Sequence, residues 1–178
     1  MSQTELQMIP AWKDGTLVPM EKLAVHQQGI RHKAVSVFVM SNDQLLIQRR
    51  ALGKYHTPGL WANTCCTHPL WDEDPRDCAI RRLDQELGVQ GLSPDYRGQV
   101  QYRADVGGGL IEDELVDVFV AQANMDVEID PNPDEVMAHR WVSVDVLTAE
   151  IADTPDQFTP WLRIYMAEHW DQILGDSV

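Results

Sequence analysis

Short apolar runs rich in β-branched residues recur along the first two thirds of the chain, with turn residues between them. Residues 34–40 (AVSVFVM) and 45–49 (LLIQR) flank the polar turn SNDQ, which predicts two strands joined by a tight connection. Two further runs lie on either side of a glycine-rich turn, and a last one follows later. These three predicted strands cover residues 98–104, 115–122 and 136–142.

A helical pattern replaces the strand pattern after residue 74. Asp74 is suited to the N-cap, Pro75 to the first helical position and Gly88 to the position just past the end. The predicted helix therefore covers residues 75–87. Its apolar stripe consists of Ile80, Leu83 and Leu87.

The C-terminal part of the chain is predicted to be helical. Thr159 and Pro160 suit the start of a helix that runs toward Ile173. Because strands dominate the first two thirds and helices flank them, we predict an α+β fold, an α/β/α sandwich. We expect one domain over residues 1–178, with a core at about 30–145 and a C-terminal helical segment at about 143–174.

Composition and charge narrow the class of partner. Hydrophobic residues make up 44% and charged residues 24% of the chain, as in ordinary globular domains. The net charge of −14 argues against a nucleic-acid surface. One segment reverses this charge, because six basic residues and one acid, Asp43, lie between Lys22 and Lys54. This segment indicates a site for a small anion, and a solvated face is the alternative on charge alone.

The start of the chain and its cysteines indicate a cytoplasmic protein. The segment MSQTELQMIPAW lacks the basic and apolar regions of a signal peptide, and no run of about eighteen apolar residues could span a membrane. The three cysteines, Cys65, Cys66 and Cys78, are too few for a disulfide framework. Since no sticky helix face is evident, we expect a monomer.

The segment WANTCCTHP, residues 61–69, contains two adjacent cysteines followed by His68. A disulfide between neighbours is strained, and a zinc knuckle separates its thiols by two to four residues, so neither explains the segment. If the segment is extended, Cys66 and His68 point to one side and Cys65 points to the other. We expect Cys65 and Cys78 to be packing residues.

Residues 67–89, THPLWDEDPRDCAIRRLDQELGV, resemble the Nudix box in register. The slots of the box are matched by Glu73, Arg81, Leu83, Glu86, Gly88 and Val89. Three slots differ, because Thr67 replaces a glycine and Arg82 and Gln85 replace glutamates. Nudix hydrolases gather Mg²⁺ with several carboxylates to activate water. A single Glu86 with Arg82 at i−4 is better suited to holding a metal-bound diphosphate than to cleaving it.

A series of motifs over about residues 15 to 165 resembles type I isopentenyl diphosphate isomerase. In chain order the motifs are EKLAVH, RHKAV, RRALGK, WANTCCTHP, RRLDQELGV, YRAD, IEDE and FTPW. The chain departs from the family where Thr67 replaces the glycine of a cysteine-glycine-histidine motif and where Cys65 adds a cysteine. The resemblance implies a Nudix-like mixed sheet flanked by helices. It also implies conversion of isopentenyl diphosphate to dimethylallyl diphosphate.

The resemblance further implies the catalytic residues. The reaction adds a proton to one carbon and removes one from another through a tertiary carbocation, so it needs an acid, a base and a dry site. Cys66 and Glu114 would form the acid–base pair, with Tyr102 beside Glu114. Trp161 would be an aromatic wall that faces the cation.

Two metal sites are implied as well. The first would hold Zn²⁺ or Mn²⁺ on a mixed nitrogen and oxygen set, His26, His32, His68, Glu112 and Glu114. Glu112 and Glu114 share one face if their strand is extended. A separate Mg²⁺ would carry the diphosphate on Glu86 and the backbone of Cys66. The residues expected to meet the phosphate oxygens are Lys22, Arg50, Lys54 and Arg82.

Two other functions compete with the isomerase. The first is a pyrophosphohydrolase of a nucleoside or other diphosphate, against which Arg82 and Gln85 argue. The second is a noncatalytic metal-binding module, against which the retention of Cys66, Glu114 and Tyr102 argues. The remaining histidines, His56, His139 and His169, are expected to be structural or exposed.

Overall fold

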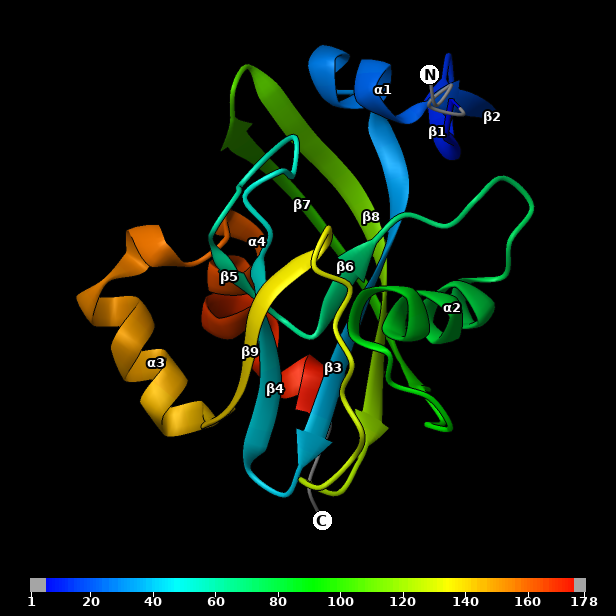
Figure 1. Cartoon of the computed structure of the whole chain (residues 1–178). Helices are drawn as coiled ribbons and strands as arrows, with labels where there is room; N and C mark the ends of the chain where they lie inside the picture. Colours follow the sequence, from blue (N-terminus) through cyan, green and yellow to red (C-terminus); the bar gives the residue numbers. More distant parts are fainter. Residues whose placement is uncertain (1–5, 175–178) are drawn as a thin grey trace.

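The computed structural model describes residues 6–174, and a mixed sheet of nine strands forms its centre (Figure 1). The middle strand is β3 (Arg31–Ser41), which pairs in parallel with β8 (Leu110–Gln122) along nearly its whole length. The other edge of β3 is divided among three antiparallel strands. These are β1 (Met8–Lys13) near its start, β6 (Cys65–Thr67) in its middle and β4 (Gln44–Arg50) at its end.

The outer strands complete the sheet. β2 (Thr16–Glu21) forms a hairpin with β1, and β7 (Asp95–Gly107) forms one with β8. β5 (Trp61–Ala62) and β9 (Val136–Ser143) both pair with β4. The five strands predicted from the apolar runs are thereby confirmed. The first hairpin and the helix α1 (Lys22–Gln28) were not anticipated by the sequence pattern.

Helix α2 (Pro75–Leu87) begins and ends where the sequence predicts. The Asp74 carboxylate accepts hydrogen bonds from the N–H groups of residues 76 and 77, and Gly88 ends the helix at a φ of 62°.

The predicted apolar stripe of α2 is partly wrong. Leu83 and Leu87 are buried, but Ile80 is 44% exposed. Cys78 and Ala79 are buried instead, because the face that meets the sheet is rotated toward them.

The C-terminal segment contains α3 (Val144–Asp153), the 3₁₀-helix η1 (Pro155–Gln157), α4 (Pro160–Ile164), the π-helical turn η2 (Tyr165–His169) and α5 (Trp170–Leu174). The helix start predicted at Thr159 is confirmed, since its hydroxyl accepts a hydrogen bond from the N–H of Leu162. The predicted single helix is interrupted by η2, which places the buried Tyr165 against the sheet.

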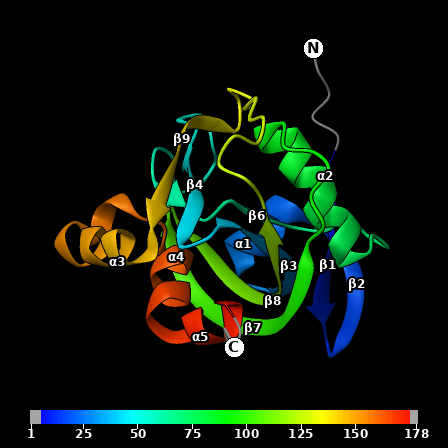
Figure 2. The same ribbon diagram turned by 90° about the horizontal axis from the view of Figure 1, so that it is seen from below.

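The side chains of β3 alternate between two apolar layers. Val35, Val37 and Val39 pack toward α2, whereas Ala34 and Phe38 pack toward α4, η2 and α5. Figure 2 shows α2 on one side of the sheet and α4 and α5 on the other. The predicted α/β/α sandwich is therefore confirmed. Within residues 6–174, no helix has the length and apolar character needed to cross a membrane.

Candidate active site

One face of the sheet carries the predicted proton-transfer residues. Strand pairing places Glu114 of β8 opposite His32 of β3, and Cys66 of β6 opposite Ser36 of β3. Tyr102 of β7 lies opposite Glu114. Directly opposite residues share a face of the sheet. Glu114 and Cys66 therefore lie on the same face, on either side of β3.

Glu112 and Glu114 are both buried and both face this side, as their spacing predicts. Asp113 between them points away and pairs with Arg31 at 3.3 Å. The Tyr102 hydroxyl lies 2.6 Å from Glu112 Oε2 and 2.7 Å from Glu114 Oε2. One hydroxyl donates only one hydrogen, so the two carboxylates compete for it. Burial, and then the charge of Glu114, raise the pKa of Glu112 well above its usual value.

Three histidines present the same nitrogen to these carboxylates. The Nδ1 atoms of His26, His32 and His68 lie 2.7, 2.8 and 3.3 Å from backbone carbonyl oxygens. Because a carbonyl only accepts, each Nδ1 carries the hydrogen and each Nε2 presents a lone pair. The Nε2 atoms of His32 and His68 lie 3.2 and 3.7 Å from Glu114 Oε1.

This arrangement of acceptors facing acceptors fits a bound cation. Among the described residues, His26 Nε2 is buried without a hydrogen-bond partner and lies 4.0 Å from Glu112 Oε1. Burial, and then the neighbouring His32, lower the pKa of His26 to about 4, which keeps the ring neutral. We name the set His26, His32, His68, Glu112 and Glu114 the histidine–carboxylate cluster. Its donor atoms suit a divalent ion that accepts nitrogen and oxygen ligands.

The two cysteines of β6 point to opposite faces, as predicted. The Cys66 sulfur accepts a hydrogen bond from Ser36 Oγ at 3.3 Å, and Ser36 Oγ lies 2.8 Å from the Tyr165 hydroxyl. Burial, and then Glu114 and Glu112, raise the pKa of the Cys66 thiol, so it keeps its proton. Cys65 does more than pack, because its thiol donates to Glu86 Oε2 at 3.2 Å.

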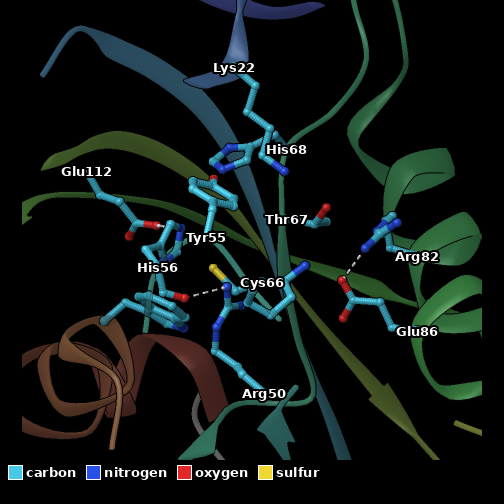
Figure 3. A pocket seen from close by; sticks show the side chains of 12 residues that line it. Lys22, Arg50, Tyr55, His56, Cys66, Thr67, His68, Arg82, Glu86 and Glu112 are labelled. Atoms are coloured by element: carbon cyan, nitrogen blue, oxygen red, sulfur yellow. Dashed lines mark hydrogen bonds and ion pairs between the residues drawn. The ribbon is translucent and has the colours of Figure 1, made fainter. Parts of the chain in front are cut away.

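Glu86 on α2 is surrounded by donors. Arg82 donates to Glu86 Oε1 at 2.6 Å (Figure 3). Gln48 of β4 donates to Oε2 of the same carboxylate at 2.8 Å. Arg82 also lies 3.3 Å from Glu135, which pairs with Lys54. We name Glu86, Arg82, Gln48 and Cys65 the Glu86 group.

The four predicted phosphate-binding cations line one cavity, in which Figure 3 labels Lys22, Arg50 and Arg82. They share it with Cys66, Thr67, His68, Glu86, Glu112 and Trp161 of the predicted site region. Burial, and then Lys54, lower the pKa of Lys22 to about 8. We name the part of the cavity that these four cations line its cationic end, which Arg50 extends to the ring of Trp161.

Trp161 is 1% exposed and forms part of the cavity wall. Its indole N–H donates to Asn63 Oδ1 at 3.2 Å, and the Arg50 guanidinium carbon lies 5.3 Å from the centre of the ring. Asn63 Nδ2 also donates to the carbonyl groups of Val37 and Cys65, so it ties Trp161 to β6.

Of the two alternatives predicted for His56, structural or exposed, the structure excludes exposure. His56 is buried in the cavity, and its Nε2 lies 3.3 Å from Glu112 Oε1. His139, in contrast, is exposed. Only one feature of the sequence indicated that His56 belongs to the site. It follows Lys54, the last residue of the basic segment, by two positions. Sequence reasoning also missed Gln48, Asn63, Glu135 and Tyr55, whose roles depend on packing between distant segments.

Comparison with known proteins identifies relatives that are similar in sequence and others that are similar in fold. A family model described as NUDIX domain matches residues 30–162. The chain is 60% identical over 168 residues to the isopentenyl-diphosphate Delta-isomerase of Dinoroseobacter shibae, covering 94% of this chain and 96% of that protein. It is 62% identical over 169 residues to the protein of the same name from Roseobacter denitrificans, covering 95% and 96%.

Solved structures of low sequence identity share the fold. The MutT NUDIX hydrolase of Burkholderia pseudomallei has a TM-score of 0.60 at 20% identity, over 78% of this chain and 98% of that chain. The MutT protein of Methanosarcina mazei Go1 has a TM-score of 0.59 at 17% identity, over 80% and 94%. The sheet and helices are thus those of the Nudix fold.

Proposed function

Since the chain belongs to the isopentenyl-diphosphate Delta-isomerase family of Nudix-domain proteins, we infer that Cys66 and Glu114 carry out its proton transfers. The enzyme converts isopentenyl diphosphate to dimethylallyl diphosphate. The observation that carries the inference is the register of the sheet, which puts Cys66 and Glu114 on one face at opposite edges of β3. A substrate lying over Ser36 would have one group on each side.

The two groups divide the reaction between them. One adds a proton to the terminal CH₂ carbon of the alkene, which leaves a tertiary carbocation at the neighbouring carbon. The other removes a proton from the adjacent CH₂ group, and that electron pair forms the new double bond. The Cys66 thiol, which keeps its proton because burial raises its pKa, can supply or return a proton at Sγ. In the reverse direction the roles of Cys66 and Glu114 exchange.

The cavity wall would protect the cation. Trp161 presents an indole ring, and such a face attracts a cation by up to about 2 kcal/mol in a dry site. Its ring already lies beside the Arg50 guanidinium, and Asn63 holds its N–H. The burial of these side chains excludes water that would otherwise capture the cation.

The diphosphate would lie at the cationic end of the cavity. Lys22, Arg50, Lys54 and Arg82 are the residues that would bind its oxygens. Glu86, with the backbone of Cys66, would hold the Mg²⁺ that accompanies the diphosphate, because Mg²⁺ favours sites completed by substrate phosphates. The histidine–carboxylate cluster would hold Zn²⁺ or Mn²⁺, whose positive charge would increase the acidity of Glu114.

Hydrolysis of the diphosphate is the competing chemistry of this fold, and two residues argue against it here. Arg82 and Gln85 replace box glutamates, and both Arg81 and Arg82 donate to Gln85 Oε1. The helix therefore offers one carboxylate, Glu86, toward the cavity. A single carboxylate gathers too little metal to activate water as the hydrolases do.

The test is conversion of isopentenyl diphosphate in D₂O by the purified protein. We expect deuterium in recovered substrate and product, together with intact diphosphate. Release of inorganic phosphate without deuterium uptake would favour the hydrolase instead. Cys66→Ala is the matched variant, because it removes one proton-transfer group while leaving Glu86 and its partners in place.

We also propose that the enzyme is a cytoplasmic monomer. It would act on a small-molecule substrate and bind neither nucleic acid nor membrane. Three unpaired thiols support a reducing compartment. Sedimentation equilibrium at working concentration tests the oligomeric state, and a mass near 20.2 kDa is expected.

A further inference from the structure

His56 is a fourth buried histidine of the cavity, and the predicted ligand set leaves it out. It lies in the loop between β4 and β5 and is 5% exposed. Its Nε2 lies 3.3 Å from Glu112 Oε1, closer than His26 Nε2 is to the same oxygen, at 4.0 Å. Its ring stacks against that of His26, with centroids 5.6 Å apart (Figure 3 shows His56 and Glu112).

Donor atoms capable of holding a metal form two groups that share His26. One contains His26, His32, His68 and Glu114, and the other contains His26, His56 and Glu112. Within each group the donor atoms lie within 4.8 Å of one another. His56 therefore occupies the Glu112 side of the histidine–carboxylate cluster, where the predicted set supplies no histidine besides His26.

The second nitrogen of His56 has the partner that a ligating histidine needs. Its Nδ1 lies 3.0 Å from the Thr57 hydroxyl, which can accept a hydrogen bond. With the hydrogen on Nδ1, the lone pair of Nε2 faces Glu112. This repeats the pattern of the other three histidines, whose Nδ1 atoms face carbonyl oxygens.

The loop around His56 is held in an unusual conformation. Thr57 has a φ of 48°, which a β-branched residue rarely adopts, and Pro58 follows it. The Arg50 guanidinium donates to the His56 carbonyl oxygen at 3.2 Å. Strain of this kind persists where the surrounding structure fixes a side chain for function. Here it directs His56 into the cavity.

The charges in the cavity indicate whether the two donor groups hold one ion or two. Glu112 and Glu114 together neutralise one divalent ion, and Lys22 and Arg50 already line the same cavity. A second divalent ion on His56 would leave two more positive charges without a buried partner. One ion shared by both groups is the arrangement that the charges allow.

We propose that His56 Nε2 is a further ligand of the single metal ion held by the histidine–carboxylate cluster. This inference rests on the metal site of the proposed function. It gives the ion four imidazoles and two carboxylates, a set that favours Zn²⁺, Co²⁺ or Mn²⁺ over Mg²⁺. Six protein ligands leave no position for a water molecule, which suits an ion that must not generate a nucleophile beside a carbocation.

The first test uses the unmodified protein loaded with Co²⁺. Paramagnetic proton NMR in H₂O detects the Nδ1–H of each histidine that binds Co²⁺ through Nε2. We expect four exchangeable shifted signals, one each from His26, His32, His56 and His68. Three signals would overturn the inference while leaving the predicted ligand set intact. A protein that binds no Co²⁺ would overturn the metal site itself.

The second test compares variants by Co²⁺ competition titration and absorption. His56→Ala should weaken Co²⁺ binding by about tenfold or more and intensify the d–d absorption, because coordination decreases. His139→Ala, which removes an exposed imidazole, is the control. His56→Gln keeps an N–H near the Nε2 position. If His56→Gln restores both affinity and spectrum, His56 is only a hydrogen-bond donor to Glu112, and the inference is wrong.

The proposed proton transfers and the proposed role of His56 can be disproved separately. Absence of deuterium exchange in D₂O would remove the proposed proton transfers whatever the number of NMR signals. Normal exchange with three signals, or with unchanged Co²⁺ affinity in His56→Ala, would remove only the role of His56.

Discussion

The carboxylates on the two faces of β6 have opposite surroundings. Glu86 receives hydrogen bonds from Arg82, Gln48 and Cys65, so its charge is balanced within the protein. Glu112 and Glu114 face each other and a set of histidine lone pairs, with one Tyr102 hydroxyl between them. The difference supports the proposal that the histidine–carboxylate cluster holds a resident cation, whereas the Glu86 group would receive one together with the substrate.

β6 makes this division with two adjacent residues. Cys66 faces the side of Glu112 and Glu114, and Cys65 faces Glu86. A period of two residues along a strand is enough to give two neighbouring thiols different chemistry.

The largest expected effect tests the different roles of Cys66 and Cys65. Cys66→Ala should lower kcat by roughly 10³-fold, because it removes a group that transfers a proton in the reaction. Cys65→Ala should keep kcat within about threefold and raise the Mg²⁺ concentration for half-maximal rate, since a thiol is a weak donor and its hydrogen bond to Glu86 contributes about 1 kcal/mol. Steady-state rates over a Mg²⁺ series measure both. Equal losses of kcat in the two variants would contradict the assignment.

The second-largest effect is expected when the ion of the histidine–carboxylate cluster is removed. An ion present at about a thousand times its dissociation constant stabilises the fold by about 4 kcal/mol. We therefore expect a strong chelator to lower the free energy of unfolding by about that amount. Zn²⁺ or Mn²⁺ should restore it, and the His32→Ala variant should show little response to chelation.

Mg²⁺ provides the contrast within the same experiment. Without a diphosphate, it should leave the unfolding transition of the intact protein almost unchanged, because Glu86 already has its partners. A large stabilisation by Mg²⁺ alone would mean that the two environments do not differ as the contacts suggest.

The third effect concerns the Glu86 group alone. Arg82→Ala should raise KM by roughly 10- to 100-fold with a smaller change in kcat, since a hydrogen bond to a charged group contributes about 1.5–3 kcal/mol. Arg76→Ala on the exposed face of α2 is the matched control, because the Arg76 guanidinium donates a hydrogen bond to Ser93, outside the Glu86 group. A loss confined to kcat would place Arg82 in the chemical step instead of in binding.

Local patterns predicted the elements that depend on neighbours in sequence. The ends of α2 follow from Asp74, Pro75 and Gly88, whose capping roles need no distant contact. The alternation of Glu112 and Glu114 likewise follows from strand geometry. The sequence therefore predicted correctly that Glu112 and Glu114 share one face of their strand.

The remainder depends on contacts between distant segments. Gln48 meets Glu86 across 38 positions, and Asn63 meets Trp161 across 98, so no spacing rule relates them. His56 was missed because its loop takes its direction from Arg50 and from the strained Thr57. Ile80 was misjudged because periodicity identifies a stripe but not how far that stripe turns toward the sheet.

Trp161 gives the fourth prediction, on the side of the histidine–carboxylate cluster. Trp161→Phe keeps an aromatic face and should retain part of the activity. Trp161→Leu keeps bulk but loses the ring, and should raise the barrier by a further 1–2 kcal/mol, about 5- to 30-fold in kcat. KM should change less than kcat in either variant, because the ring would face the hydrocarbon end and would meet the diphosphate only indirectly, through Arg50. Equal kcat values for the two variants would reduce Trp161 to a packing role.

The smallest effect concerns pH and the cationic end of the cavity. Burial, and then Lys54, lower the pKa of Lys22 to about 8 in the free protein, so Lys22 is charged below pH 8 and loses its charge above it. The value of kcat/KM, which reports the free enzyme, should therefore fall by about fivefold as pH rises through 8. A bound diphosphate would raise the pKa of Lys22 by stabilising its charged form, so kcat itself should stay flat over this range. Lys22→Arg keeps its charge at every working pH and should remove the decline in kcat/KM. If Lys22→Arg showed the same decline, another group would control it, and the cationic end would bind substrate through Arg50, Lys54 and Arg82 without help from Lys22.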